Sequence, residues 1–479
     1  MTMLNLRLLL FITMLLMSST ASTQSGEGYT WLAGDHHIHS RYSVSWNRDV
    51  DPPTPVRGGD AIYPIHMNAL MGKYFGLSWT VATDHGGPNH SKVNLEWAYP
   101  ELVQSRLAVP EVVQFWGMEF DTPGADHSSL IIPFTENEAR QLFELESKWA
   151  KREPWPAEET WNTESRMLAA LKEMRDMQPP PLLIANHPSR SASDFRQYGY
   201  DDPAELRGWN DTAPNVAVGM AGAPGHQAAT LLPDGTASAE RRARGGYGNY
   251  PTHGGFDQMT AMVGGFWDSM IGEGRDWWIT ANSDSHVHYS EGGSDFWPGE
   301  YSKTYVWGQK NHESIMDGIR NGRIFVTTGD LIDQLFVSAD SNQSGETTEI
   351  GGTLAVSAGD SVTVTISFQD PDTLNNNGDN PVVHRVDLIT GSISESANDP
   401  SEDTNTSTRV VARFGQSEWS DLGTFRSVSY TLSDIRTDTY LRVRGTNGDE
   451  LEPEPDPRGE DPWTDLWFYS NPIRILVDQ

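Results

Sequence analysis

The chain has 479 residues, more than one ordinary hydrophobic core holds, so its length predicts two domains. Its 34 basic and 66 acidic residues give a net charge of -32, which disfavours nucleic acid and anionic membranes as partners because both require a basic surface. It has no cysteine, and this excludes disulfides, thiolate metal ligands and a cysteine-linked lipid anchor.

The N-terminal segment has the layout of a secretory signal peptide. Arg7 precedes an apolar run from Leu8 to Met17, and small polar residues follow. The run is too short to span a bilayer, and no other segment of the sequence resembles a transmembrane helix. We therefore expect residues 1–23 to be a signal peptide cleaved near Ala21, and the mature protein to be secreted or periplasmic.

The first part of the chain, up to residue 330, alternates short apolar runs with helical stretches. Ranges 136–151 and 163–177 are typical of helices. The runs typical of buried strands are "LSWTVATDHGG", "EVVQFWGMEF", "PLLIANHPSR" and "RDWWITANSDSH". Repeated strand-then-helix units predict an α/β fold with parallel strands, whose functional groups gather at the carboxyl ends of the strands. Each of these runs has His, Asp or Glu at that end.

The last part, 331–479, has a different texture. Alternating Val, Thr and Ile patterns separated by Asn, Asp and Gly turns predict an antiparallel β module of about seven short strands, most simply a sandwich. Its acidic loops "DPDTLNNNGDN" and "NGDELEPEPDPRGED" resemble calcium-binding stretches, although neither has the EF-hand spacing.

Three histidines lie within four residues in "GDHHIHS", at the end of the first expected strand. Side chains alternate faces along a strand, so His37 and His39 project together while His36 points to the opposite face. Two imidazoles on one face can bind one divalent metal ion. We expect His36 to pack or hydrogen-bond behind the strand, and Asp35 to orient the strand end.

Further motifs follow at the ends of the later runs. They are "TDHG" at 83–86, "GMEF" at 117–120 with His127 shortly after it, "NHPSR" at 186–190 and "NSDSH" at 282–286. In this order the motifs resemble those of the PHP superfamily, named for its polymerase-associated and histidinol-phosphatase members. The resemblance implies a distorted (β/α)7 barrel over 28–330 with two or three divalent metal ions (Zn, Mn or Fe) at its mouth.

The resemblance also assigns metal ligands. The first metal would be held by His37, His39, Glu119 and Asp284. The second would be held by Glu119, His127 and His187, with Glu119 bridging. His85 and His286 match ligands of a third metal in trinuclear members, but Ser45 stands where those members have another histidine. We name His66 and His90 as candidate replacements.

Other residues have alternative roles. Without a third metal, His85 and His286 would serve as general acid and electrostatic clamp. Asp84 would orient His85 or cap a helix, and we favour the first role. Arg190 would contact an anionic substrate or form a structural salt bridge. The remaining candidates are expected to be loop residues (His226, His253 and His288) or core residues (Trp267, Trp277, Trp278 and Trp297), with lining of the pocket as the alternative for each group.

The downstream half carries a second resemblance. "WDSMIGEGRDWWITANSDSH", "DGIRNGRIFVTTGD" and the terminal "YSNPIRI" resemble the CehA/McbA-like branch, which contains carbamate hydrolases, whereas many superfamily members hydrolyse phosphoesters. The leading expectation is an exported phosphoesterase in which a hydroxide bridging two metals attacks phosphorus. The alternatives are a hydrolase of carbamates, esters or amides, and a metal-stabilised binding protein without catalysis. The expected partner is a small-molecule ester or carbamate.

Overall fold

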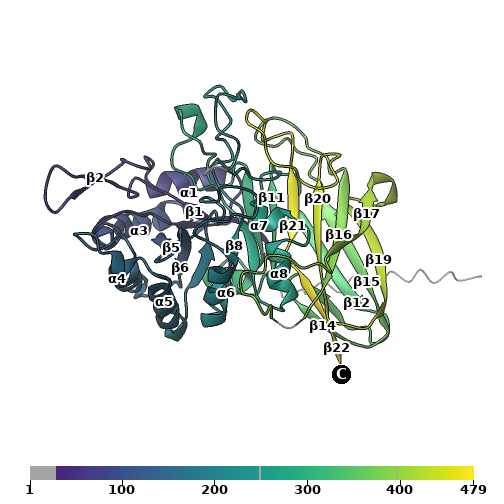
Figure 1. Ribbon diagram of the computed structural model, residues 1–479. Coiled ribbons are helices and arrows are strands. Elements are labelled where there is room, and N and C mark those ends of the chain that lie inside the picture. Colours follow the sequence, from purple (N-terminus) through teal and green to yellow (C-terminus); the bar gives the residue numbers. More distant parts are fainter. Residues whose placement is uncertain (1–27, 247–249, 395, 479) are drawn as a thin grey trace, which may run out of the picture.

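The computed structural model describes residues 28–246, 250–394 and 396–478 (Figure 1). The predicted signal peptide, 1–23, lies outside these ranges. None of the helices in the described part is long and apolar enough to cross a membrane. The fold is mixed α/β, as predicted, with a 15-stranded mixed sheet, a separate five-stranded antiparallel sheet and a small hairpin. In Figure 1 the helices and the early strands occupy one side of the molecule and the late strands the other.

Seven strands of the large sheet, all between residues 30 and 281, neighbour one another in sequence order. They are β1 (Thr30–Ile38), β4 (Trp79–Ala82), β5 (Val113–Asp121), β6 (His127–Ile132), β7 (Leu182–Ala185), β8 (Ala217–Ala223) and β9 (Trp278–Ala281). Neighbouring pairs are parallel except on the two sides of β6, which runs antiparallel to β5 and β7. The expectation of parallel strands is therefore wrong for β6, because the chain turns back in a hairpin that pairs Asp121 with His127.

Helices follow most of these strands. The longer ones are α1 (Ile65–Tyr74), α3 (Tyr99–Ala108), α4 (Glu138–Trp149), α5 (Glu164–Asp176), α6 (Pro203–Thr212), α8 (Phe266–Gly272) and α9 (His312–Arg320). Helices α4 and α5 lie within the ranges predicted for them. At the start of α6, the Asp202 side chain accepts from the backbone N–H of Glu205 at 2.9 Å, and Pro203 fits the first turn, where its missing N–H costs nothing.

The carboxyl end of β1 also meets the segment after β9. Ile38 forms an isolated parallel bridge with Ser285, and the backbone N–H of His39 donates to the Ser285 carbonyl at 3.0 Å. This contact places "GDHHIHS" directly beside "NSDSH".

The large sheet also contains two later strands of the first part and six strands of the last part of the chain. Its further members are β10 (Ser302–Gly308), β11 (Ile324–Thr328), β14 (Thr353–Ser357), β16 (Arg385–Ser392), β17 (Arg409–Gly415), β20 (Thr439–Thr446), β21 (Trp467–Ser470) and β22 (Ile473–Asp478). Strand β11 pairs with β10 on one side and with β21 on the other. Hydrogen bonding in this sheet therefore runs through the boundary predicted at residues 330 and 331.

The five-stranded sheet lies against these late strands. It contains β12 (Gln334–Ser341), β13 (Thr347–Glu349), β15 (Asp360–Gln369), β18 (Ser420–Leu422) and β19 (Phe425–Ile435). Burial alternates along β12 and β15 with the period of two that a half-buried strand requires. The inward side chains, such as Val337 and Val364, share one hydrophobic core with Leu441 and Val443 of β20.

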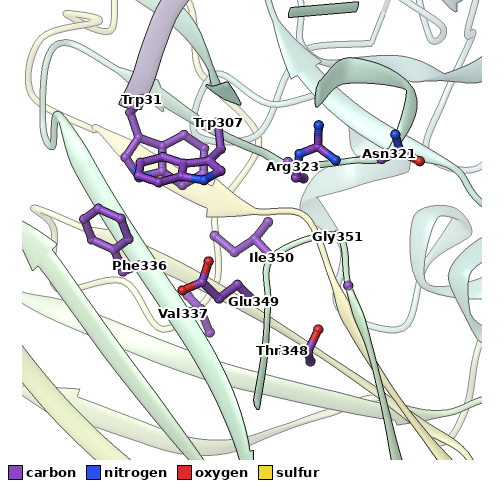
Figure 2. Close-up of a pocket in the computed structure, with 11 residues that line it drawn as sticks. Trp31, Trp307, Asn321, Arg323, Phe336, Val337, Thr348, Glu349, Ile350 and Gly351 are labelled. Carbon is purple, nitrogen blue, oxygen red and sulfur yellow. The ribbon is translucent and has the colours of Figure 1, made fainter. Parts of the chain in front are cut away.

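A cavity of about 240 Å³ lies between the two parts. Figure 2 shows Trp31 and Trp307, which are cross-strand partners, on one side of this pocket and Arg323 on the other, with Glu349 below them in the view. Trp31 is near the amino end of β1, whereas the clustered histidines lie at its carboxyl end. The pocket is therefore separate from the residues that the motifs single out.

The second acidic loop has a structural role. Asp456, Glu460 and Asp465 surround the buried guanidinium of Arg244, with nitrogen–oxygen distances of 3.1, 3.1 and 2.7 Å. Asp456 also accepts from the backbone N–H of Gly254 at 2.7 Å. In this loop, which resembles a calcium-binding stretch, the chain itself supplies the cation.

Candidate metal centre

Imidazoles and carboxylates from five strand ends converge at one edge of the large sheet, as the α/β pattern predicts. All of them are buried. The residues are His37 and His39 from the end of β1, Glu119 from β5, His127 at the start of β6, His187 after β7 and Asp284 after β9. The structure thus brings together the full predicted ligand set of the first two metals, and the ligand atoms lie close enough to hold metal ions.

The first group is built on the alternation of β1. His37 Nε2 and His39 Nε2 lie 2.9 Å apart, and both approach Asp284 Oδ1, at 3.0 and 2.9 Å respectively. His36 points the other way, with its ring nitrogens 3.0 Å from Ser129 Oγ and 2.8 Å from Thr280 Oγ1. Its hydrogen-bonding role behind the strand agrees with the prediction.

Asp35 ties the first strand to the segment that carries Asp284. Its carboxylate accepts from the backbone N–H groups of His37, at 3.0 Å, and Ser283, at 3.1 Å. Burial raises the pKa of Asp35 to about 7. The residue orients the strand end, as predicted.

The second group is centred on Glu119. Its Oε1 lies 3.1 Å from His127 Nδ1 and 3.0 Å from His187 Nε2. His127 reaches this position because β6 runs back along β5, so the first residue of β6 lies beside the carboxyl end of β5. His187 and Asp284 both have positive φ, 32° and 46°, which is uncommon for residues other than glycine and is typical of functional sites.

In the two groups, the imidazoles and the carboxylates shift one another's pKa values. Burial lowers the pKa of His37, but the carboxylates of Asp284 and Glu119 outweigh it and raise that pKa to about 10. Burial raises the pKa of Glu119, but the neighbouring His127 and His37 hold it well below its usual range. Without metal, protons on His37 and His127, whose pKa values are raised, balance the buried carboxylates, so metal ions must displace these protons to bind.

A third group adjoins the first. The ligand atoms of His39, His85 and His286 lie within 4.8 Å of one another. Asp60, which no motif indicated, places Oδ2 3.0 Å from His85 Nε2 and 3.6 Å from His286 Nε2.

Neither residue proposed to replace the histidine missing at Ser45 joins this group. His66 is half-exposed beside Glu101, and His90 is buried with Nδ1 2.7 Å from Glu146 Oε1. That expectation is wrong: an aspartate from the loop between β3 (Thr54–Val56) and α1 lies there instead.

Asp84 supports His39 rather than His85. Its carboxylate accepts from the Ser43 hydroxyl at 2.9 Å, and Ser43 Oγ lies 2.7 Å from His39 Nδ1. Asp84 also accepts from the backbone N–H and the hydroxyl of Ser40, both at 2.6 Å. The prediction that Asp84 orients His85 is therefore wrong, because its partners come from the loop after β1.

Two arginines flank the second group. Arg190 forms a two-pronged ion pair with Asp126, which is the salt-bridge alternative considered for it. Arg152, which sequence reasoning missed, places Nε 2.7 Å from Asp121 Oδ1 and a terminal nitrogen 3.0 Å from His85 Nδ1.

Of the residues predicted to lie in loops or in the core, one lies at the site and the others lie elsewhere. His226 lies at the site, with Nε2 3.6 Å from Asp284 Oδ2 and Nδ1 bonded to Asp295. His253 and His288 bond elsewhere, to Tyr250 and Glu300. Trp267, Trp277 and Trp278 belong to the core, and Trp297 stacks on His288. Comparison of the chain with family models, curated proteins and solved structures finds no match.

Proposed function

We propose that the protein is a metal-dependent hydrolase whose centre holds at least two divalent ions. The observation that carries this proposal is the position of Glu119 between the two groups. One carboxylate oxygen lies 3.2 Å from His37 Nε2 and 3.0 Å from His187 Nε2, and the other lies 3.5 Å from His39 Nε2. A carboxylate placed in this way can bridge two cations.

The donor set fits such ions. Imidazole and carboxylate ligands suit Zn, Mn or Fe. Bonds of about 2.1 Å in tetrahedral geometry separate neighbouring ligand atoms by about 3.4 Å, and octahedral geometry brings them closer. The separations of 2.9 to 3.5 Å between ligand atoms of His37, His39, Asp284 and Glu119 are of that order.

The fold is consistent with the proposed superfamily. Five of the seven successive strands β1 and β4 to β9 carry the proposed ligands at their ends, and the bridge between Ile38 and Ser285 links the first strand to the segment after the last. These features support a closed (β/α)7-type barrel of the PHP kind, with the site at its mouth. The N-terminal sequence pattern supports export of the chain.

Several side chains of the protein have distinct roles in the proposed hydrolysis. When bound, the ions supply a nucleophile derived from water at neutral pH and stabilise the negative charge that develops during attack. Glu119 and Asp284 supply the negative charge that holds the ions, and Asp35 and Asp84 fix the histidines of the first group. His286 and His226 lie beside Asp284, where a leaving group can receive a proton.

A phosphoester is the substrate class that we favour. Arg152 and Arg190 bring two guanidinium groups beside the second metal group in a chain whose net charge is strongly negative, and guanidinium suits phosphate oxygens. A carbamate or carboxylic ester is the second candidate, because each of these arginines is already paired with an aspartate.

A substrate panel tests the proposal. Metal-loaded protein is assayed side by side on chromogenic phosphomonoester, phosphodiester, phosphotriester and aryl carbamate substrates, with His187→Ala as the disabled variant and His253→Ala, a buried histidine bonded to Tyr250, as the matched control. We expect phosphoester hydrolysis that His187→Ala abolishes and His253→Ala retains. Preference for the carbamate would overturn the substrate class, and full activity of His187→Ala would overturn the site.

A further inference from the structure

The histidines of the third group differ in the atom that lies opposite Nδ1, the ring nitrogen that points away from the group. A histidine that binds metal through Nε2 normally donates its Nδ1–H to an acceptor. His39 Nδ1 faces Ser43 Oγ, whose own proton goes to Asp84, and His286 Nδ1 faces the carbonyl oxygen of Asp284 at 2.9 Å. Both rings can therefore carry the proton on Nδ1 and leave Nε2 free for a metal.

His85 has the opposite arrangement. Its Nδ1 lies 3.0 Å from a terminal nitrogen of Arg152. A guanidinium has donors and no acceptor, so Nδ1 must accept this hydrogen bond, and the proton of the neutral ring is on Nε2. That Nε2 lies 3.0 Å from Asp60 Oδ2, where it donates. A nitrogen that carries a proton has no lone pair for a metal.

The position of Arg152 is set by the site itself. Its Nε donates to Asp121 Oδ1 at 2.7 Å, and the same oxygen lies 3.3 Å from His127 Nε2. Arg152 is thus held between the second metal group and His85.

Without His85 the third group is incomplete. His39 Nε2 is already directed at Asp284 in the first group, which leaves His286 and Asp60 as the further donors. Building on the proposed metal centre, we infer that Arg152 is a positioning residue that holds His85 outside the coordination sphere, as a hydrogen-bond donor to Asp60, so that the centre is dinuclear.

Metal stoichiometry in saturating Zn or Mn tests this inference. Bound metal per chain is measured by elemental analysis after removal of free ions. We expect about two ions in the wild type and in His85→Gln, since His85 binds none. Arg152→Gln places an amide oxygen opposite His85 Nδ1, and this oxygen can accept from Nδ1–H. His85 Nε2 can then bind a metal, so the bound metal is expected to rise to about three ions per chain.

Two further variants serve as controls. Arg152→Lys keeps a donor facing Nδ1 and should stay at about two ions, as should Arg190→Gln, which removes the other arginine beside the site. The tautomer is read independently from the side-chain ¹⁵N shifts of His85 in the metal-free wild type, which should show protonated Nε2. Melting curves identify variants that fold.

The outcomes separate the two proposals. A wild type with about three ions, of which His85→Gln loses one, would overturn the inference and leave the hydrolase proposal standing. A folded Arg152→Gln that stays at about two, or a His85 protonated at Nδ1, would also overturn it. If the wild type binds no stoichiometric metal, the proposed function itself fails.

Discussion

Ser43 shows how single residues behind the ligands shape the candidate centre. Its hydroxyl accepts from His39 and donates to Asp84, so it links a candidate metal ligand to a buried carboxylate through two hydrogen bonds. Such supporting contacts fix the tautomer and the orientation of the ring.

Ser43→Ala should therefore weaken metal binding roughly 10- to 100-fold without removing a ligand. The measurement is a competition titration against a chelator of known affinity. Ser105→Ala is the matched control, because the buried Ser105 hydroxyl donates to Gln114 Oε1, near the amino end of β5 and away from the candidate ligands. Equal affinity in both variants would contradict the role given to Ser43.

His90 gives a pH dependence that does not involve the metal ligands. Burial lowers its pKa, but Glu146 outweighs burial and raises that pKa from 6.5 to about 9. A pKa raised in the folded state means that the stabilisation is complete below pH 6.5 and is lost as pH rises through 9, a change of about 3 kcal/mol.

Urea unfolding between pH 6 and pH 10 measures this effect. The free-energy difference between wild type and His90→Gln should shrink across that window. A constant difference for His90→Gln would contradict the assignment.

At the residue scale, alternation within one strand predicted that His37 and His39 would act together and that His36 would turn away. It did not predict the positions of Asp60 or Arg152, because both come from loops whose place depends on tertiary contacts. The same limit explains the wrong role for Asp84, since its hydrogen bond to Ser43 joins two separate loops.

At the scale of elements, Gly34 in β1 leaves the space into which Trp79 of β4 packs. A Cβ on Gly34 would lie 1.9 Å from the ring of Trp79, whose indole N–H donates to the Leu32 carbonyl at 2.9 Å. The indole crosses β1 just before the histidines, so this packing holds the strand that presents them.

Gly34→Ala should destabilise the protein by roughly 1–3 kcal/mol, because the buried Trp79 ring must move. Gly415→Ala, at a position with no heavy atom within 4 Å of the added Cβ, should change stability by less than about 0.5 kcal/mol. Urea unfolding midpoints test the pair, and indistinguishable variants would contradict the packing argument.

The strand-then-helix pattern predicted α4, α5 and the ligand-bearing strands other than β6, because each has a strong local signal. It did not predict that β6 is reversed. The residues of β6 are as completely buried as those of a parallel strand, and its direction depends on the short turn between Asp121 and His127.

At the scale of the whole molecule, a buried ion pair joins the two parts of the chain. Arg442 in β20 donates twice to Asp268 in α8, at 2.8 Å each, and both side chains are inaccessible to solvent. The change of texture near residue 330 predicted where the β-rich part begins, but the shared sheet and this pair depend on contacts that no local pattern encodes.

Arg442→Met should cost about 3–5 kcal/mol, because it leaves the carboxylate of Asp268 buried without its cation. Adding Asp268→Asn should recover part of that loss. Arg436→Met, which removes an exposed arginine paired with Asp434, should leave stability unchanged. Denaturant unfolding measures all of these variants, and a double variant no better than the single one would contradict a charge-based role.

The central claim is that Glu119 joins two metal groups, and bound metal per chain in Glu119→Gln tests it most directly. Glu146→Gln is the matched control, since Glu146 is an equally buried carboxylate that bonds to His90 away from the centre. We predict about two ions or more in the wild type and in the control, and fewer than about one in Glu119→Gln, with hydrolysis lost in parallel. Full metal content in a folded Glu119→Gln would contradict the account.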